Sequence, residues 1–408
     1  MTKKLDCEYI IVGAGLSGLA CATVLERAGA DWQMVEAAPR VGGRVQSDLS
    51  HQGYILDRGF QVLNSAYPAL HSLIDLDRLK LGHFAPGAEV RWNGRFHRLG
   101  DPLRTPQDLL STLAAPVGGV ADKLKILELV RFCANPANHN AVEGMSSEEF
   151  LCHFGFSEVM VERFFRPFFS GVFLEEELLT SARKLVSLFS YFSKGRASLP
   201  SGGMQSLPEL LASELNQARI HLSQPVASWK KNSLEGPELR VKAKRLILAG
   251  WEVQELLLGL PRPATHQACT VWFSAGQKPG LANRYLRLNG SGAGVVQTVA
   301  FNSCVQPGYA PADRELVAVS LRRRTSESQA IEELMSWFGE SVKEWEHLKT
   351  DVVSNALPAE YSKLSAPGPF QEKGFGVYCC GDHTETGSIQ GALTSGRRAA
   401  LQALGSLC

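Results

Sequence analysis

The sequence carries almost no net charge: 42 Lys and Arg residues balance 41 Asp and Glu residues, leaving a formal charge of +1. It also lacks an acidic or basic tail. Binding to the phosphate backbone of a nucleic acid needs a clustered basic face. A nucleic-acid partner is therefore not expected.

Regularly spaced cysteines are also lacking. The nine cysteines are an odd number and are scattered, Cys379 and Cys380 are adjacent, and no CxxC pair occurs. Disulfide frameworks and zinc sites depend on paired or regularly spaced cysteines. We therefore expect no disulfide framework and no bound metal. We expect the cysteines to be reduced thiols in a cytoplasmic setting.

The sequence lacks a convincing membrane span, which needs about 20 apolar residues. The uncharged stretch from Tyr9 to Leu25 is shorter and contains Gly13, Gly15 and Gly18. No small-residue cleavage site of a signal peptide is obvious beside it. A cofactor-binding loop explains these glycines better than a membrane segment does.

A strand, a glycine-rich loop, a helix and a second strand follow one another near the start of the chain. They are expected at Glu8–Val12, Gly13–Gly18, Leu19–Ala28 and Trp32–Val35, with Gly29 as the helix stop and Glu36 after the second strand. The apolar runs predict buried strands. This order is typical of a dinucleotide-binding unit, so we predict an α/β fold with a Rossmann-type domain.

Each part of this unit has a mechanical reason. Gly13 permits the tight turn, Gly15 lets the backbone approach a pyrophosphate, and Gly18 lets the helix pack closely on the sheet. The helix N-terminus offers N–H groups to phosphate oxygens. A carboxylate at Glu36 suits a ribose and repels the 2′-phosphate of NADP, which favours FAD or NAD. The candidate cofactor contacts are Gly13, Ala14, Gly15, Leu16, Ser17, Gly18 and Glu36.

The next segment, Ala37-Ala-Pro-Arg-Val-Gly-Gly-Arg44, narrows the choice of cofactor. It resembles the extension that marks the FAD-binding amine oxidase superfamily, which includes monoamine and polyamine oxidases, protoporphyrinogen oxidases and carotenoid desaturases. The resemblance implies that Ala37, Gly43 and Arg44 contact FAD, the arginine neutralising charge on the diphosphate. The alternative is a surface turn with a solvated arginine.

The segment Leu56-Asp-Arg-Gly-Phe-Gln-Val-Leu63 also resembles this superfamily. In such proteins a glycine-containing turn lies close to the isoalloxazine ring. The resemblance implies Gly59, Phe60 and Gln61 as contacts, and the alternative is a plain hairpin turn.

The C-terminus supplies a third resemblance. An apolar strand is expected from Phe375 to Cys380, followed by Gly381-Asp382 and by Gly387-Ser-Ile-Gln-Gly-Ala392, which begins a helix. In the superfamily the Gly-Asp pair bonds the ribityl–phosphate region, and the helix start points N–H groups toward the pyrimidine end of the flavin. The implied contacts are Gly381, Asp382, Ser388, Ile389 and Ala392. Alternatively, Asp382 is only a turn or cap residue.

Three weaker resemblances lie in the middle of the chain. Leu199-Pro-Ser-Gly-Gly-Met204 is similar to a segment of phytoene desaturases, and Arg166-Pro-Phe-Phe-Ser-Gly-Val-Phe173 to a segment of the same branch. Pro225-Val226-Ala227 resembles a strand in which a valine backbone touches adenine, which implies Val226 as a contact.

These segments predict a discontinuous FAD-binding domain, because long insertions separate the cofactor contacts. We expect it at residues 1–95, 200–265 and 366–408, with Arg245–Gly250 as a returning core strand. A substrate-binding α+β domain would comprise residues 96–199, rich in helices, and 266–365, rich in strands.

The sequence favours an oxidoreductase in which FAD performs the redox step and the protein supplies orientation and electrostatics. No Ser-His-Asp or metal-ligand cluster is apparent, no catalytic residue is assigned, and His383 is interpreted as structural. The sequence shows no second glycine-rich motif, so we expect no separate NAD(P)-binding domain.

Features that amine oxidases commonly show are missing. Ser388 stands where they place an aromatic residue, and Gly294–Phe301 contains no lysine. No cysteine lies between Asn355 and Tyr378, so we expect noncovalent FAD. These departures favour a dehydrogenase or desaturase of the phytoene desaturase or protoporphyrinogen oxidase type. A mono- or polyamine oxidase and a non-catalytic flavoprotein are the alternatives.

The aromatic segment Phe164–Phe173 leaves two interpretations open. One is core packing in a helical domain. The other is an apolar substrate tunnel or a membrane-facing patch. With such a patch, the protein would be cytoplasmic and bind peripherally to a membrane surface. We expect a small, apolar substrate, and the oligomeric state is left open.

Overall fold

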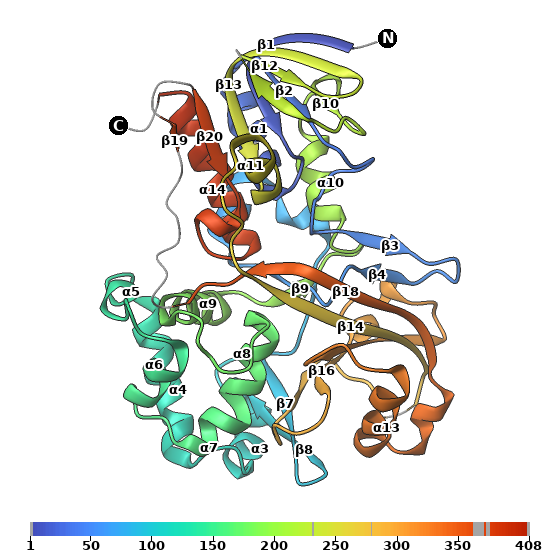
Figure 1. Cartoon of the computed structure of the whole chain (residues 1–408). Coiled ribbons are helices and arrows are strands. Elements are labelled where there is room, and N and C mark those ends of the chain that lie inside the picture. The colour runs from blue at the N-terminus through green and yellow to red at the C-terminus, as the bar shows by residue number, and fades with distance from the viewer. Residues whose placement is uncertain (1–2, 231, 279, 362–370, 373–375, 406–408) are drawn as a thin grey trace.

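The computed structural model describes residues 3–230, 232–278, 280–361, 371–372 and 376–405. Two large sheets with helices packed around them form the mixed α/β fold that the sequence predicted (Figure 1). One sheet is mainly parallel and the other mainly antiparallel.

The parallel core of the first sheet brings distant segments together. Its strands are β10 (Ile220–His221), β2 (Trp32–Val35), β1 (Lys3–Val12), β13 (Leu239–Ala249) and β20 (Val377–Cys380), each parallel to its neighbour. Because parallel strands end at the same edge, the loops after β1, β2, β13 and β20 meet there. Phe375, the expected first residue of the last strand, lies outside the described residues.

Shorter strands extend this sheet. β11 (Ser228–Lys230) and β12 (Ser233–Glu235) form an antiparallel extension of β13, and β19 (Gln371–Glu372) pairs with β20. The returning core strand that the sequence predicted near Arg245 is the end of β13, between β1 and β20.

Helix α1 (Leu16–Arg27) comes from the N-terminal part of the chain and helix α14 (Ile389–Ala403) from the C-terminal part, and the two lie side by side (Figure 1). α1 begins three residues before the predicted Leu19, because Gly15 itself is the N-cap residue. Gly29, with φ of +67°, follows the end of α1 as expected.

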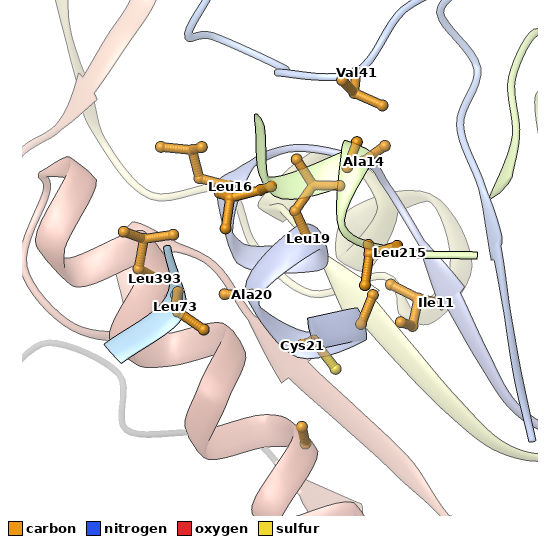
Figure 2. Close-up of a cluster of buried hydrophobic side chains, with 14 of the residues drawn as sticks. Ile11, Ala14, Leu16, Leu19, Ala20, Cys21, Val41, Leu73, Leu215 and Leu393 are labelled. Carbon is orange, nitrogen blue, oxygen red and sulfur yellow. The ribbon is translucent and has the colours of Figure 1, made fainter. Parts of the chain in front are cut away.

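An apolar cluster fixes α1 between the sheet and its helical neighbours. Figure 2 shows Leu16 and Leu19 of α1 near Leu73 of α2 and Leu393 of α14, with Ile11 of β1 on the sheet side. The helices that contribute to this cluster or flank the sheet are α2 (Pro68–Leu73), α10 (Ser206–Ser213) and α11 (Trp251–Leu258). Thus the N-terminal loop is held by residues from both ends of the chain.

The second sheet has seven strands. In order they are β18 (Glu346–Pro358), β14 (Thr265–Gly276), β17 (Arg314–Leu321), β16 (Val296–Phe301), β15 (Leu286–Asn289), β7 (Gly87–Trp92) and β8 (Arg95–Gly100). Helices α12 (Asn302–Val305) and α13 (Glu327–Phe338) accompany it.

One predicted domain boundary does not fit this sheet. The expected FAD-binding segment 1–95 includes β7, but β7 pairs in parallel with β15 and antiparallel with β8. A boundary at residue 95 would therefore divide a hairpin. The other limits of the two-domain division stay a prediction.

A helical group occupies the segment between β8 and β9. Its helices are α3 (Leu109–Ala114), α4 (Val120–Ala134), α5 (Asn138–Ala141), α6 (Ser147–His153), α7 (Glu158–Met160), α8 (Arg166–Phe173) and α9 (Ala182–Lys194). Phe165, Phe169 and Phe173 are fully buried in its core. The core interpretation of the aromatic segment is therefore confirmed for these side chains. In the part of the chain that is described, no helix combines the length and apolarity that crossing a membrane requires.

Two small sheets lie between the larger elements. β3 (Ser47–Leu49) and β4 (Ile55–Asp57) form a hairpin. β9 (Ala197–Leu199) pairs with β5 (Leu63–Asn64) and β6 (Gly82–His83).

The contact between α1 and α14 makes a testable prediction. A Cβ atom added at Gly396 of α14 would lie 1.9 Å from the Ser17 carbonyl oxygen. Alanine otherwise stabilises a helix relative to glycine by about 1 kcal/mol. We expect Gly396→Ala instead to lower the free energy of unfolding by about 1–3 kcal/mol, because the backbones must separate.

Urea unfolding measures this effect. Gly276→Ala is the matched control, because a Cβ atom there meets nothing within 4 Å. A Gly396→Ala protein as stable as the wild type would show that the two helices do not pack this closely.

Candidate functional site

The glycine-rich loop turns sharply from β1 into α1. Gly13 has a φ of +105°, and a Cβ atom there would lie 2.5 Å from the Ala249 carbonyl oxygen. A Cβ atom at Gly18 would lie 1.9 Å from the Gly13 carbonyl oxygen. Both positions therefore need glycine, for the turn and for close packing of the helix.

The N-terminus of α1 is open for an anionic group. At Gly15 an added Cβ atom would meet only the Cα atom of Gly43, at 4.0 Å. No side chain of the described residues caps the helix, and its first turn holds no acidic residue. Its first N–H groups and positive dipole end are thus available to a phosphate. The Ala14, Leu16 and Ser17 side chains are buried, so these residues can offer a ligand only their backbone.

Glu36 is fixed beside this loop. One carboxylate oxygen accepts a hydrogen bond from Ala14 N at 2.7 Å, and the other accepts one from Ala38 N at 2.8 Å. The Glu36 carbonyl oxygen accepts a bond from Gln224 N, which brings the Val226 segment to the same edge of the sheet. Ala37 is exposed at the turn that follows.

Arg44 connects the N-terminal segment to the C-terminal one. Its guanidinium forms an ion pair with Asp382, with 2.5 Å between Nη2 and Oδ1, and donates to the Ala356 carbonyl oxygen at 3.1 Å. It also lies over the Trp251 ring, 4.6 Å from the centroid. The preceding Gly43, with φ of +60°, packs against Gly15. Arg44 thus lies between the glycine loop and the segment after β20.

The segment after β20 is held by its own hydrogen bonds. Gly381 N donates to Ser395 Oγ at 2.9 Å, and the Asp382 side chain is almost fully buried. Ser388 caps α14, since its Oγ accepts from Gly391 N at 2.9 Å. Ile389 begins the helix, and Ala392 follows one turn later, half-buried.

The turn at Gly59 joins this region to the second sheet. Gly59 has a φ of +82°, and Phe60 N donates to Thr270 Oγ1 of β14 at 3.1 Å. Gln61 Nε2 donates to the Arg44 carbonyl oxygen at 3.1 Å. The turn therefore lies where the Arg44 segment meets β14.

His383 has the surroundings of a structural residue. Its Nε2 lies 3.0 Å from Gln254 Oε1, and its ring meets Trp251 edge-on. Burial lowers the pKa of His383, with the nearby Asp382 acting in the opposite direction. A neutral imidazole that helps to hold the loop agrees with the sequence interpretation.

Asp57, whose side chain is fully buried, is a residue that the sequence did not single out. Its Oδ1 accepts hydrogen bonds from Ser47 Oγ at 2.5 Å and Met204 N at 2.9 Å, and its Oδ2 accepts one from Tyr309 at 3.1 Å. Asp57 thereby ties the turn at Gly59 to the Gly-Gly-Met segment. Asp57 and Met204 both lay in segments that the sequence singled out, but nothing local linked them.

A second missed group lies at the start of α14. The buried Lys184 forms an ion pair with Glu360 at 2.7 Å, and the same carboxylate oxygen accepts a bond from Gly387 N at 2.5 Å. Helix α9 is thus connected to Gly387, the residue before the Ser388 cap. A buried lysine with one carboxylate partner was the available signal, but its partner lies 176 residues away.

These contacts fit an FAD molecule that spans the edge of the first sheet. The open glycine cradle and the uncapped α1 suit a diphosphate, and Glu36 suits a ribose. The N-terminus of α14 is the positive end of its helix dipole and would stabilise negative charge on a nearby flavin ring. The individual residue assignments stay predictions.

Comparison with known families agrees with this geometry. The family model for flavin containing amine oxidoreductases matches residues 16–404. The chain belongs to this family. It is accordingly an FAD-dependent oxidoreductase, as the sequence predicted.

Curated relatives within this family are distant. Protoporphyrinogen oxidase 2 of Arabidopsis thaliana is 26% identical over 261 residues, which cover 55% of this chain and 50% of the relative. Coproporphyrinogen III oxidase of Bacillus subtilis is 22% identical and is matched over 61% of this chain and 54% of its own length. The matched region thus spans about half the length of these relatives.

Solved structures share the fold over nearly the whole chain. An oxidoreductase from Methanosarcina mazei has a TM-score of 0.73 at 17% identity, covering 96% of this chain and 99% of that chain. A putrescine oxidase bound to putrescine has a TM-score of 0.72 at 20% identity, covering 99% of this chain and all of the other. At these identities the likeness establishes the fold alone.

The position of Arg44 predicts its contribution to cofactor affinity. We expect Arg44→Met to weaken FAD binding at least about tenfold, or about 1.4 kcal/mol, because a diphosphate would lose a charged partner. Titration of apoprotein with FAD, followed by flavin fluorescence, measures this. Arg262→Met is the control, because that exposed arginine pairs with Glu255 away from the loop. If the wild type, Arg44→Met and Arg262→Met bound FAD with equal affinity, Arg44 would not contribute to FAD binding.

Asp57 predicts a pH dependence of stability. Burial raises the pKa of Asp57 to about 6, despite hydrogen bonds from Ser47, Met204 and Tyr309 that act in the other direction. Because the folded pKa exceeds the ordinary value of 3.8, the stability contributed is fully present below about pH 4 and is lost as the pH rises through about 6. The difference corresponds to about 3 kcal/mol.

The neutral variant Asp57→Asn should remove this part of the pH dependence. Its side-chain oxygen can still accept from Ser47 and Met204, while its amide can donate to the Tyr309 hydroxyl. Urea unfolding between about pH 4 and pH 7 compares the two proteins. Parallel stability curves for wild type and variant would mean that Asp57 does not titrate in this range.

Proposed function

We propose that this protein is a dehydrogenase or desaturase that removes a hydride from an apolar small molecule, of the protoporphyrinogen oxidase or phytoene desaturase type. Its FAD is held noncovalently. The proposal goes beyond membership of the oxidoreductase family, because it names a substrate class. A flavin amine oxidase is the alternative.

One observation carries this choice: the carboxylates around the start of α14 already have cationic partners. Glu360 pairs with Lys184, Asp382 pairs with Arg44, and Glu385 pairs with Arg398. An amine substrate that binds as an ammonium ion needs an unpaired carboxylate or a comparable acceptor. Among the described residues, these three carboxylates are committed to the protein itself. The surroundings therefore favour a substrate without an ammonium group.

The region around the turn at Gly59 supports an apolar substrate. Phe60 packs edge-on against Phe84, and both belong to or border a buried apolar cluster with Tyr54, Leu56 and Trp272. Apolar walls with few polar groups are typical of small-molecule sites. The relatives named for protoporphyrinogen and coproporphyrinogen oxidation add support for this substrate class.

The residues of the chain have separate duties in this proposal. Glu36 would hold the adenosine ribose, the Val226 backbone the adenine, and Arg44 with the start of α1 the diphosphate. Gly381 and Asp382 would hold the ribityl–phosphate region. FAD supplies the hydride-accepting ring when it is bound.

Two other segments would contact the flavin ring, where the substrate reacts. The turn Gly59–Gln61 would border the ring, and the start of α14 at Ser388, Ile389 and Ala392 would stabilise negative charge on it. No acid or base of the chain is assigned to the reaction. No membrane contact forms part of the proposal.

Anaerobic flavin bleaching tests the substrate class. Protein reconstituted with FAD is mixed with protoporphyrinogen, with coproporphyrinogen III or with putrescine, and the flavin absorbance is followed in a stopped-flow instrument. We expect at least one of the two tetrapyrroles, whose macrocycle is apolar and carries no ammonium group, to reduce the flavin, and putrescine to leave it oxidised.

Two results would contradict the proposal in different ways. Rapid bleaching by putrescine, with none by the tetrapyrroles, would favour the amine oxidase alternative. A flavin that dithionite reduces but that none of these or related polyene substrates reduces would favour a non-catalytic flavoprotein.

A further inference from the structure

A cavity of about 640 Å³ lies beside the small sheet of β5, β9 and β6, and none of the proposed FAD contacts belongs to its lining. We call it the basic cavity. The cationic side chains that line it are those of Lys80, Arg104, Lys194 and Arg196, with His71 and His83 beside them. Asp77 is the acidic residue of the lining, so positive charge is in excess.

Most of these cations lack a counter-ion. Within the described ranges, no ion pair is formed by Lys80, Lys194 or Arg196. Arg104 lies 3.5 Å from Asp101, but its guanidinium is mainly occupied by the carbonyl oxygens of residues 193 and 195. Three cationic ends are therefore free to meet an anion.

His83 responds to this positive charge. Burial lowers the pKa of His83, and the charges of Arg196 and Arg284 lower it further. Its Nδ1 lies 2.8 Å from Ser198 Oγ. The imidazole is therefore neutral at pH 7 and adds a polar group to the cavity without adding charge.

The wall that carries Lys194 and Arg196 is fixed. Ser65 N donates to the Arg196 carbonyl oxygen at 3.0 Å, and Arg196 N donates to Ser65 Oγ at 2.9 Å. A Cβ atom at Gly195 would lie 2.4 Å from Asn64 Oδ1 and 2.6 Å from Ala66 N. The close approach of these two segments sets the position from which both cationic side chains extend.

An anion-binding site accounts for this arrangement better than an ordinary solvated surface does. Exposed lysines and arginines usually spread apart, because like charges repel. Here cations from three separate segments, at Lys80, Arg104 and Lys194–Arg196, line one concavity. Bringing them together is unfavourable unless an anion offsets the repulsion.

We propose that the basic cavity binds a small polyanion carrying phosphate or carboxylate groups. Its volume lies in the range of about 300–1,000 Å³ that is typical of small-molecule sites. Leu76 and Leu81 also line the cavity and can cover an apolar part of the ligand. A concave site suits a compact free ligand better than a flat membrane surface or a nucleic-acid backbone.

Helix α2 connects this site with the proposed FAD region. His71 of α2 lines the cavity, and Ala69 N of the same helix donates a hydrogen bond to Gln390 Oε1 in the first turn of α14, at 3.0 Å. The proposal itself rests on the cavity and does not depend on the substrate assigned above.

Calorimetric titration of FAD-saturated protein with pyrophosphate, and separately with citrate, tests the proposal. Saturation with FAD keeps pyrophosphate out of the cofactor site. At low ionic strength we expect saturable binding of at least one anion, weakened by added salt because screening reduces the attraction. The double variant Lys194→Glu with Arg196→Glu should weaken binding at least about tenfold.

Matched variants separate the site from general charge effects. Arg78→Glu changes an exposed arginine on the neighbouring segment that pairs with Glu214 and does not line the cavity, and it should bind like the wild type. Lys194→Gln provides a milder change should the double variant not fold, and it too should weaken binding. Retention of the flavin spectrum checks that each variant is intact.

The proposal is overturned if neither anion binds, or if the cavity variants and Arg78→Glu bind equally well. Binding to vesicles containing phosphatidylglycerol, with no binding of either free anion, would also overturn it and would identify a membrane surface instead.

Discussion

The ion pair between Arg44 and Asp382 joins residues 338 positions apart, and the proposed cofactor site depends on it. The pairing is made possible by strand order, because β2, β1, β13 and β20 are parallel neighbours in that order. Arg44 follows β2 and Asp382 follows β20, so both segments lie at the same edge of the sheet. The N-terminal glycine loop alone indicates a dinucleotide site. The segment around Asp382 lies beside it through Arg44 and adds the contacts proposed for the rest of FAD.

Close backbone packing supports this meeting. Gly396 of α14 lies against Ser17 of α1, and Leu393 lies with Leu16 in the same apolar cluster. On the other side, the ion pair of the buried Lys184 with Glu360 holds Gly387, the residue before the Ser388 cap. Helix α9 thus helps to position the segment that leads into α14.

Much of this architecture was predictable, because its signals are local. The glycine loop, Glu36 and the Gly-Asp pair each combine a strand with the residues that follow it. The membership of β7 in the second sheet was not predictable, since its partner β15 lies about two hundred residues later and a hairpin pattern does not name a third strand. Asp57 was missed for the same reason: its burial arises only when Met204 and Tyr309 are brought to it.

A structure determined with bound FAD tests the central claim most directly. The account predicts the adenosine ribose at Glu36, the diphosphate between Gly15 and Arg44, and the ring between the turn at Gly59 and the start of α14. A flavin bound with its diphosphate away from both Arg44 and the N-terminus of α1 would contradict it.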